Sequence, residues 1–423
     1  MEAQKNKSIQ LVKDILIAVT LVLISSFIGV VLLGAVYMIP SDSVREHIKE
    51  SSSFLSEHDD HYKWNGNGNY YSEVDLFTDS LMMSTAAYNG DMSLVDKVLL
   101  NPRFDDSEIP QKSDDLVEDV KKIARNDHIV TYPRYWHGYL LVLKPLLVFL
   151  NVSEVRLLTM IIYMCLFCAD AVIVFQKTKL HGTLLFVICN LILNPVSVMQ
   201  CLQFSSCVFL MLVYLFILLH MDERLTERRR RTLFMLLGIS TAFFDLLTFP
   251  LMPLGILLIY HILIKNDSKN ELIEVFRLCI SWAGGYAGMW GMKWVIASIL
   301  TEVNVVSNAL EQILKRSAST VTMSGNEVTK ITIFDVIKQN GKVIVSNRLF
   351  AIAVVVFVLY LLIKAIRRKY ILSLSYKRVF ALLFVSVIPF VWFLFTKNHS
   401  MIHFWMTFRI LTVSFCGVLA MMY

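Results

Sequence analysis

Long apolar runs recur along this chain, and polar stretches of unequal length separate them. The runs from Ile15 to Ile39 and from Val379 to Phe395 are typical. An α-helix rises about 1.5 Å per residue, so about 20 apolar residues cross a hydrocarbon core of roughly 30 Å. The pattern therefore predicts an all-α polytopic membrane protein with about ten transmembrane helices, at residues 14–39, 154–176, 182–202, 205–221, 232–248, 250–265, 278–300, 349–365, 379–396 and 402–422.

Two long polar blocks divide the chain into five parts. The run from Gly138 to Leu150 lies inside the first block, is too short for a span and contains Pro145, so we interpret it as an interfacial or re-entrant helix. The five parts are an N-terminus with the first helix at 1–39, a long loop at 40–153, a transmembrane bundle at 154–300, a second loop at 301–348 and C-terminal helices at 349–423.

Shorter patterns predict local structure in the first loop. Ser41 to Ser56 has the start of an amphipathic helix, and the glycines between Asn65 and Asn69 indicate consecutive turns. Asp79 to Leu100 has helical spacing, with an apolar stripe suited to the membrane surface. The charged stretch from Asp105 to Asp127 is expected to form a solvated helix over the site.

The distribution of basic residues predicts the orientation of the chain. Lys and Arg gather in the short loops at 1–13, 177–181, 222–232, 265–277 and 364–378, whereas the opposing short connections hold only Lys397. Cytoplasmic loops carry an excess of Lys and Arg. We therefore expect both termini in the cytoplasm and the blocks 40–153 and 301–348 on the extracytoplasmic side, with Arg228 to Arg231 acting as a topology signal.

Composition agrees with membrane insertion and narrows the function classes. The chain is 56% hydrophobic and 17% charged, with a mean hydropathy of +0.58, which lies outside the range of soluble domains. The net charge of +6 comes from loop residues that topology explains, so we expect no nucleic-acid partner. All 7 cysteines lie in apolar runs, where Cys165 and Cys168 are expected to pack as small hydrophobic residues.

Three ionisable residues inside predicted spans point to a shared polar cavity. Asp245, Lys293 and Arg409 lie in different spans but at one depth, near the extracytoplasmic face. Charged side chains inside a bilayer cost several kcal/mol unless they are paired, so they mark functional sites. Arg and Lys suit a phosphate or pyrophosphate group, and His399 and His403 extend this basic patch.

The segment from Tyr132 to Tyr139 combines aromatic and basic residues before the short apolar run. Aromatic belts are common at membrane interfaces. Arg134 and His137 are not needed for a belt, so a turn that binds sugar or phosphate above the cavity is the second interpretation.

Asp75 and Asp79 are the candidate catalytic residues. They are four residues apart, share one face of a helix, and open an apolar helical run. A carboxylate there can remove a proton from an acceptor hydroxyl or coordinate a divalent cation. Such a cation is the one cofactor left open, because two histidines are too few for a zinc site. The run from His58 to His61 is a weaker, metal-like alternative.

With a first span, a long outer loop carrying an early acidic residue, and broken helices at the outer face, the chain resembles the GT-C class of membrane glycosyltransferases. It also looks like bacterial membrane proteins of surface-polysaccharide loci, in the segments 75–80, 132–139, 243–250 and 399–409. The resemblance implies a carboxylate base at Asp75 or Asp79, donor-phosphate ligands at Arg409 or Lys293, and a bacterial plasma membrane location.

The expected function is sugar transfer from a polyprenyl-phosphate donor to a cell-surface glycan or lipid-linked acceptor, on the extracytoplasmic side of the lipid bilayer. One alternative is a surface-polysaccharide polymerase that uses lipid-diphosphate substrates and depends on Arg and His. A flippase or transporter for lipid-linked glycans is a second alternative, and an acyltransferase with a catalytic His is a third. A flippase predicts an internal repeat and a charged path through the membrane, and the sequence has neither.

Overall fold

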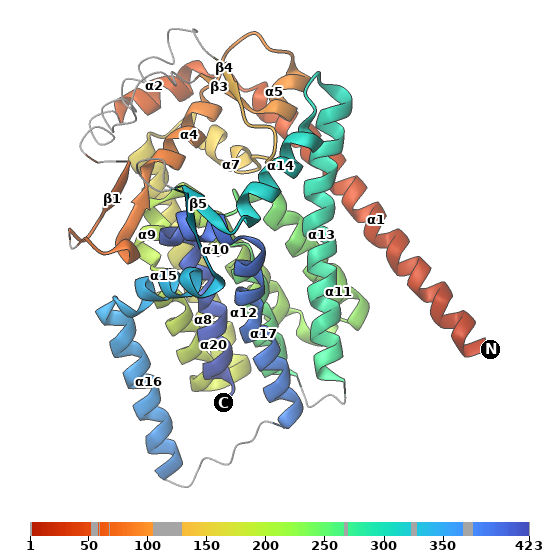
Figure 1. Ribbon diagram of the computed structural model, residues 1–423, viewed down its shortest axis with the longest axis vertical. Helices are drawn as coiled ribbons and strands as arrows, with labels where there is room; N and C mark the ends of the chain where they lie inside the picture. The colour runs from red at the N-terminus through yellow and green to blue at the C-terminus, as the bar shows by residue number, and fades with distance from the viewer. Residues whose placement is uncertain are drawn as a thin grey trace.

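The computed structural model describes residues 2–51, 58, 60–66, 68–104, 129–265, 270–322, 328–366 and 375–422. It is mostly helical and has two layers, a bundle of long helices and a cap of short helices and hairpins at one end (Figure 1). Both chain ends lie away from that cap (Figure 1). The long elements are α1 (Glu2–Tyr37), α8 (Val152–Leu193), α10 (Leu202–His220), α11 (Glu227–Phe244), α12 (Leu251–Ile264), α13 (Glu271–Leu300), α16 (Arg348–Ile366) and α17 (Tyr376–Phe395).

Short elements build the cap and the ends of the bundle. From the first polar block come α2 (Asp42–Glu50), β1 (His61–Lys63), η1 (Tyr70–Ser72), β2 (Glu73–Asp75), α4 (Leu76–Ala86), α5 (Leu94–Leu100), β3 (Pro102–Phe104), β4 (Ile129–Thr131) and α7 (Leu140–Leu147). The rest are α9 (Pro195–Gln200), η2 (Asp222–Arg224), α14 (Val305–Ser317), β5 (Thr320–Thr322), β6 (Val328–Lys330), α15 (Ile333–Val345), α18 (Lys397–Ile402), α19 (Phe404–Thr407), η3 (Phe408–Leu411) and α20 (Thr412–Ala420).

Membrane insertion is supported by four helices that are long and apolar enough to cross a bilayer. A fifth span results if α15 and the following helix, which bend by 86° at their junction, are counted as one. The ten predicted spans are therefore supported only in part, because helices such as α12, with 14 residues, are short for a full crossing. Within the described residues, the four are Val12–Tyr37, Val152–Leu193, Leu202–His220 and Tyr376–Phe395.

Helix α8 is a hairpin rather than one straight rod. Its backbone leaves the helical region at Lys179, where φ is 58° and ψ is −158°. Tyr163 Oη donates to Asn190 Oδ1 at 2.8 Å, and the rings of Phe167 and Phe186 stack at 5.1 Å. A straight helix would separate Tyr163 from Asn190 by about 40 Å. The turn at Lys179 agrees with the predicted polar connection at 177–181.

The predicted helix at 182–202 ends early. Asn194 has a left-handed backbone with φ of 56°, and Pro195 follows it and begins α9. Proline disfavours the helical conformation of the residue before it, so the helix stops there. The predicted span at 402–422 is also interrupted, because α19, η3 and α20 follow one another as short pieces.

In the first polar block, two local predictions agree with the structure, one is wrong and one lies outside the described residues. Helix α2 lies where the amphipathic pattern predicted it, and Gly66 and Gly68 both have positive φ. The predicted helix from Asp79 to Leu100 is two helices, α4 and α5, because Ser93 caps a new helix start by accepting from Asp96 N. The stretch predicted as a charged helix at 105–127 lies outside the described residues.

The run from Gly138 to Leu150, predicted as an interfacial or re-entrant helix, contains α7. The 8 residues of α7 rise about 12 Å, which is too little to cross a bilayer. Lys144 of α7 is buried, and its Nζ donates to Ser41 Oγ at 3.0 Å. His47 Nδ1 of α2 lies 2.9 Å from the carbonyl oxygen of Leu147. These polar contacts connect α2 and α7 within the cap.

Three two-stranded antiparallel hairpins complete the cap, β1–β2, β3–β4 and β5–β6. In the first hairpin, His61 is opposite Asp75 and Lys63 is opposite Glu73. The hairpin lies on α9: Tyr62 Oη donates to Gln200 Oε1 at 2.9 Å, and Trp64 Nε1 donates to Ser197 Oγ at 3.1 Å. The break after Asn194 thus provides the platform for the hairpin.

Candidate functional site

Asp75 and Asp79 lie together at the start of α4, as their spacing predicted. Asp75 is the N-cap of the helix: its Oδ1 accepts from Thr78 N at 2.8 Å and its Oδ2 from Thr78 Oγ1 at 2.9 Å. Gln203 Nε2, from the first turn of α10, also donates to Asp75 Oδ2. Asp75 therefore joins the cap layer to the helix bundle.

Asp79 is fully buried and surrounded by donors. Its Oδ2 accepts from the backbone N–H of Leu202 at 3.0 Å, and its Oδ1 from that of Gln203 at 3.2 Å. Arg156 Nη2 lies 3.4 Å from Oδ2. Burial raises the pKa of Asp79 to about 6, although Arg156 and the two N–H groups oppose the rise. A carboxylate at the N-terminus of α10 also interacts favourably with the helix dipole.

Glu73 is a third carboxyl group in this cluster, beside Asp75 on β2. It is 2% exposed, and burial raises its pKa to about 7, while the positive charges of Lys63 and Arg409 oppose the rise. Its oxygens make long ion pairs, 3.5 Å from His61 Nδ1 and 3.6 Å from Lys63 Nζ. Glu73 thus retains capacity to accept a further hydrogen bond.

Arg409 lies on the bundle side of the carboxyl groups, in η3. Its Nε donates to the Leu193 carbonyl at 3.0 Å, its Nη1 donates to the Trp405 carbonyl at 2.9 Å, and its guanidinium lies 4.2 Å from the Phe204 ring centroid. Arg409 Nη2 is buried without a hydrogen-bond partner among the described residues, and so is Trp405 Nε1. Leaving a buried donor unsatisfied costs about 1–3 kcal/mol.

The two predicted histidines extend from Arg409 toward the hairpin. The rings of His399 and His403 are 4.7 Å apart, and the His403 ring is 5.1 Å from that of Trp405. Trp405 in turn lies 5.0 Å from the ring of His61.

No family model, curated protein or solved structure matches this chain. Function is therefore argued from the site itself.

Asp245 lies beside this cluster at the end of α11. Its Oδ2 accepts from Thr248 N at 3.0 Å and it also binds the Thr248 hydroxyl, so it closes the turn between α11 and α12. In the same turn, the Leu247 carbonyl lies 3.0 Å from His399 Nε2. Phe249 follows, with its ring centroid 5.8 Å from the Arg409 guanidinium. The turn that carries Asp245 therefore contacts His399 and Arg409, but the Asp245 carboxylate itself is hydrogen-bonded to Thr248.

Lys293, Arg134 and His137 form a separate group. Lys293 is buried, and its Nζ donates to Val98 O and Asn101 Oδ1, each at 3.0 Å, and lies 5.4 Å from the Trp136 ring centroid. Among the described residues, no hydrogen bond or ion pair joins this group directly to Arg409. The common cavity expected for Lys293 and Arg409 thus stays a prediction.

His137 is held by neighbours in the chain, and Arg134 is held by a residue of α14. His137 has a positive φ of 57°, its Nδ1 lies 2.9 Å from Tyr139 Oη, and its Nε2 lies 3.0 Å from Tyr132 O. Burial lowers the pKa of His137 to about 3, so the ring is neutral. Arg134 Nη1 donates to Asn308 Oδ1 at 2.8 Å. Substrate binding by either residue would require an exchange of these partners.

Sequence reasoning missed Glu73, His61 and Trp405 as members of one cluster. Glu73 and Asp75 are on either side of Val74 on a short strand. The sequence signal in this stretch was the helical spacing of Asp75 and Asp79, which does not include Glu73. A Trp near the end of a predicted span, such as Trp405, is ordinary in an interfacial aromatic belt, so the sequence did not mark it as a site residue. Only the docking of the hairpin against α19 brings these side chains together.

No group of three or more His, Cys, Asp or Glu side chains suited to a metal ion occurs within the described part of the chain. A divalent cation at Asp75 and Asp79 stays a prediction without added support.

Proposed function

We propose that this protein is a membrane glycosyltransferase of the GT-C type, with ten membrane passes, that moves a sugar from a polyprenyl-phosphate donor to a surface glycan or lipid-linked acceptor. The observation that carries the proposal is the pairing of a carboxyl cluster with two buried, unsatisfied donors, Arg409 Nη2 and Trp405 Nε1. Sugar transfer from a lipid phosphate needs these two chemical parts, a base and a phosphate ligand.

The donor phosphate binds Arg409 and Trp405 in this proposal. A guanidinium N–H and an indole N–H both donate to phosphate oxygens, and charge-assisted bonds are the stronger kind. The free Nη2 and Nε1 atoms lie on residues four apart, and Arg409 Nη1 already donates to the Trp405 carbonyl. A phosphate at this position satisfies both donors and stabilises the negative charge that develops on the leaving group.

Glu73 is the proposed base. The acceptor hydroxyl attacks the anomeric carbon as the sugar–phosphate bond breaks, the electron pair of that bond leaves with the phosphate, and the hydroxyl proton moves to Glu73. Its pKa of about 7 suits proton removal at physiological pH. Among the predicted carboxylates, Asp75 is assigned to positioning and Asp79, engaged by Arg156 and two N–H groups, to the α4–α10 junction.

The experiment is an in vitro transfer assay with the purified protein in lipid nanodiscs and a radiolabelled polyprenyl-phosphate sugar. Glu73→Gln is expected to lower kcat by about 10²- to 10⁴-fold, the usual contribution of a general base. Arg409→Gln is expected to lower kcat by about 10²- to 10³-fold, as for other transition-state charge donors. Asp75→Asn and Asp79→Asn test the two residues predicted from sequence.

The matched control is Glu46→Gln, which changes an exposed carboxyl group on α2. It should retain full activity. The membrane level and melting temperature of each variant separate lost chemistry from lost folding. Full activity in Glu73→Gln, Asp75→Asn and Asp79→Asn would exclude a base in this cluster. Loss of activity only in Arg409→Gln would favour the polymerase alternative.

A further inference from the structure

A concave site lies between α1, α11 and α13, and the residues of the carboxyl cluster do not line it. It is a groove of about 760 Å³, within the roughly 300–1,000 Å³ range of small-molecule sites. Apolar side chains of α1 form one wall, and Met235 and Met292 belong to the other. Gly284 and Gly291 lie on its floor, and a Cβ added at either would meet no atom within 4 Å, so the groove is open at these two positions. Between them α1 packs closely on α13, because a Cβ at Gly288 would lie 2.9 Å from Val22 Cγ2.

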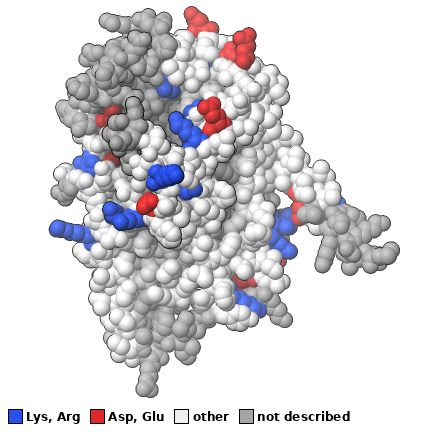
Figure 2. Space-filling model, viewed as in Figure 1, with Lys and Arg blue, Asp and Glu red and all other residues white. Residues whose placement is uncertain are grey.

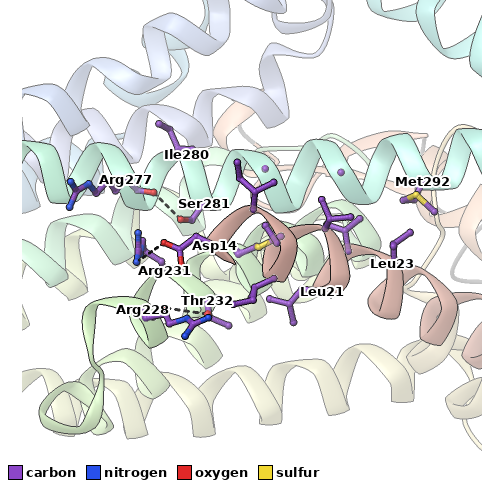
Figure 3. Close-up of a pocket in the computed structure, with 18 of the residues that line it drawn as sticks. Asp14, Leu21, Leu23, Arg228, Arg231, Thr232, Arg277, Ile280, Ser281 and Met292 are labelled. Carbon is purple, nitrogen blue, oxygen red and sulfur yellow. Dashed lines mark hydrogen bonds and ion pairs between the residues drawn. The ribbon is translucent and has the colours of Figure 1, made fainter. Parts of the chain in front are cut away.

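The groove is basic at one end and apolar along its length (Figure 3). Arg228, Arg231 and Arg277 gather at one end, and Leu23 and Met292 lie toward the other (Figure 3). Arg277 and Met292 are separated by 15 helical residues, or about 22 Å along α13. That length exceeds half of a hydrocarbon core of roughly 30 Å, so it accommodates a chain from one leaflet.

Charge at the basic end favours an anion. Asp14 Oδ2 lies 3.2 Å from Arg231 Nη2 and offsets one of the three guanidinium groups. Glu227 and Glu274 line a smaller polar hollow of about 100 Å³ that shares Arg231 and Arg277. Glu274 is already paired with Lys265. Three arginines against Asp14 and Glu227 leave one positive charge, which matches one phosphodiester group.

The four arginines from Arg228 to Arg231 have different surroundings. Arg230 is buried and pairs with Asp222 at 3.0 Å, so it belongs to the bundle. Arg228 and Arg231 line the groove. Arg229 is exposed and is not a lining residue, which makes it a matched control on the same helix.

We propose that this groove binds one anionic glycerophospholipid, with its phosphate on Arg228 and Arg277 and an acyl chain along the glycine-lined floor. The groove runs beside the middle of α1, from Asp14 to Leu23, and its basic end includes Arg277 near the start of α13, which lies away from the cap (Figure 1). This inference does not rest on the proposed sugar transfer. The bound lipid holds α1 against α11 and α13 where the helices separate.

The test is native mass spectrometry and thermal unfolding of the full chain in detergent, with added phosphatidylglycerol or phosphatidylcholine. Phosphatidylglycerol is expected to remain bound and to raise the melting temperature, and phosphatidylcholine is not. Arg277→Gln and Arg228→Gln should each weaken binding about fivefold, the effect of one basic residue at an anionic lipid. Gly284→Leu should remove binding by filling the groove, whereas Arg229→Gln should keep it.

Several results would overturn the proposal. Equal retention of the two lipids would show that charge does not select the occupant. Undiminished phosphatidylglycerol binding in Gly284→Leu would place the lipid elsewhere. Soluble glycerol phosphate is the third arm, and a melting shift as large as that of the lipid would mean that the basic end binds free phosphate and the apolar groove is not used.

Discussion

At the scale of single residues, the distinction between Glu73, Asp75 and Asp79 decides the chemistry. All three carboxyl groups are buried within one strand and one helical turn. Asp79 is held by Arg156 and the α10 N-terminus, whereas the ion pairs that Glu73 makes with His61 and Lys63, among the residues that the structure describes, are long. The number of donors around each group, rather than its charge, therefore separates a candidate base from a structural carboxylate.

The pH dependence of transfer tests the role of Glu73. A base acts only when deprotonated, and burial raises the pKa of Glu73 from its usual value to about 7. The rate should therefore rise about tenfold per pH unit below 7 and level off above it. Lys63→Met removes a positive charge that lowers this pKa, so the rising limb should move to higher pH by about half a unit.

The control for that measurement is Lys49→Met, on the exposed face of α2, which should leave the profile unchanged. A flat rate between pH 5 and 8 would be inconsistent with Glu73 as the base. So would a profile that keeps its rising limb in Glu73→Gln.

At the scale of elements, breaks in the helices determine where the carboxyl cluster lies. Asn194 ends the second half of α8 and its Nδ2 donates to Tyr71 O at 2.7 Å, so the break holds the β1–β2 hairpin that carries Glu73. Gly238 of α11 and Gly285 of α13 have a different effect and bring these two helices together. A Cβ at Gly238 would lie 2.1 Å from Trp282 O, and one at Gly285 would lie 2.2 Å from Met235 O.

The α8 hairpin makes a prediction of its own. In a cysteine-free background, the pair Tyr163→Cys and Asn190→Cys should be joined efficiently by a short bifunctional thiol reagent, because the native side chains are in contact. The matched pair Leu272→Cys and Ile299→Cys is also 27 residues apart, but on the unbroken helix α13. It should not react, since about 40 Å separates the two positions.

Cross-linking at equal rates in both pairs would show that the reaction is intermolecular or that the helices are disordered. No reaction in either pair would contradict the hairpin at Lys179. Mass spectrometry of the proteolysed product distinguishes intrachain from interchain links.

At the scale of the whole molecule, polar and apolar surfaces are segregated. Charged side chains gather on the upper part of the face drawn in Figure 2, and the broad area below is mostly uncharged. Exposed apolar residues of the long helices include Phe276, Ile280 and Val391. Exposed apolar area of this extent belongs in a lipid environment.

A membrane-impermeant thiol reagent tests how the molecule sits in the bilayer. Asn89→Cys lies in the cap, between α4 and α5, and Arg224→Cys lies in the connection between α10 and α11. In a cysteine-free background, intact cells should be labelled at position 89 and should be labelled at position 224 only after permeabilisation. Labelling of both positions in intact cells would show that the cap and the α10–α11 connection do not lie on opposite sides of the membrane.

By itself, the sequence determined the membrane class, the approximate position of most helices, the turn at 177–181 and the start of α4. These features depend on hydrophobic periodicity and on turn residues, which act over a few positions. The sequence also contained the Asn194-Pro195 turn signal, but the long apolar run around it concealed the break in the predicted span.

The tertiary structure alone decided which polar groups meet. Glu73, Gln203 and the Trp405–Arg409 pair come from three distant segments, and Lys293, predicted at the same depth as Arg409, instead binds Val98 and Asn101. Depth in a membrane is a single coordinate that the sequence specifies through span length. The position around the bundle depends on how helices pack and where they break, and these long-range contacts fixed the site.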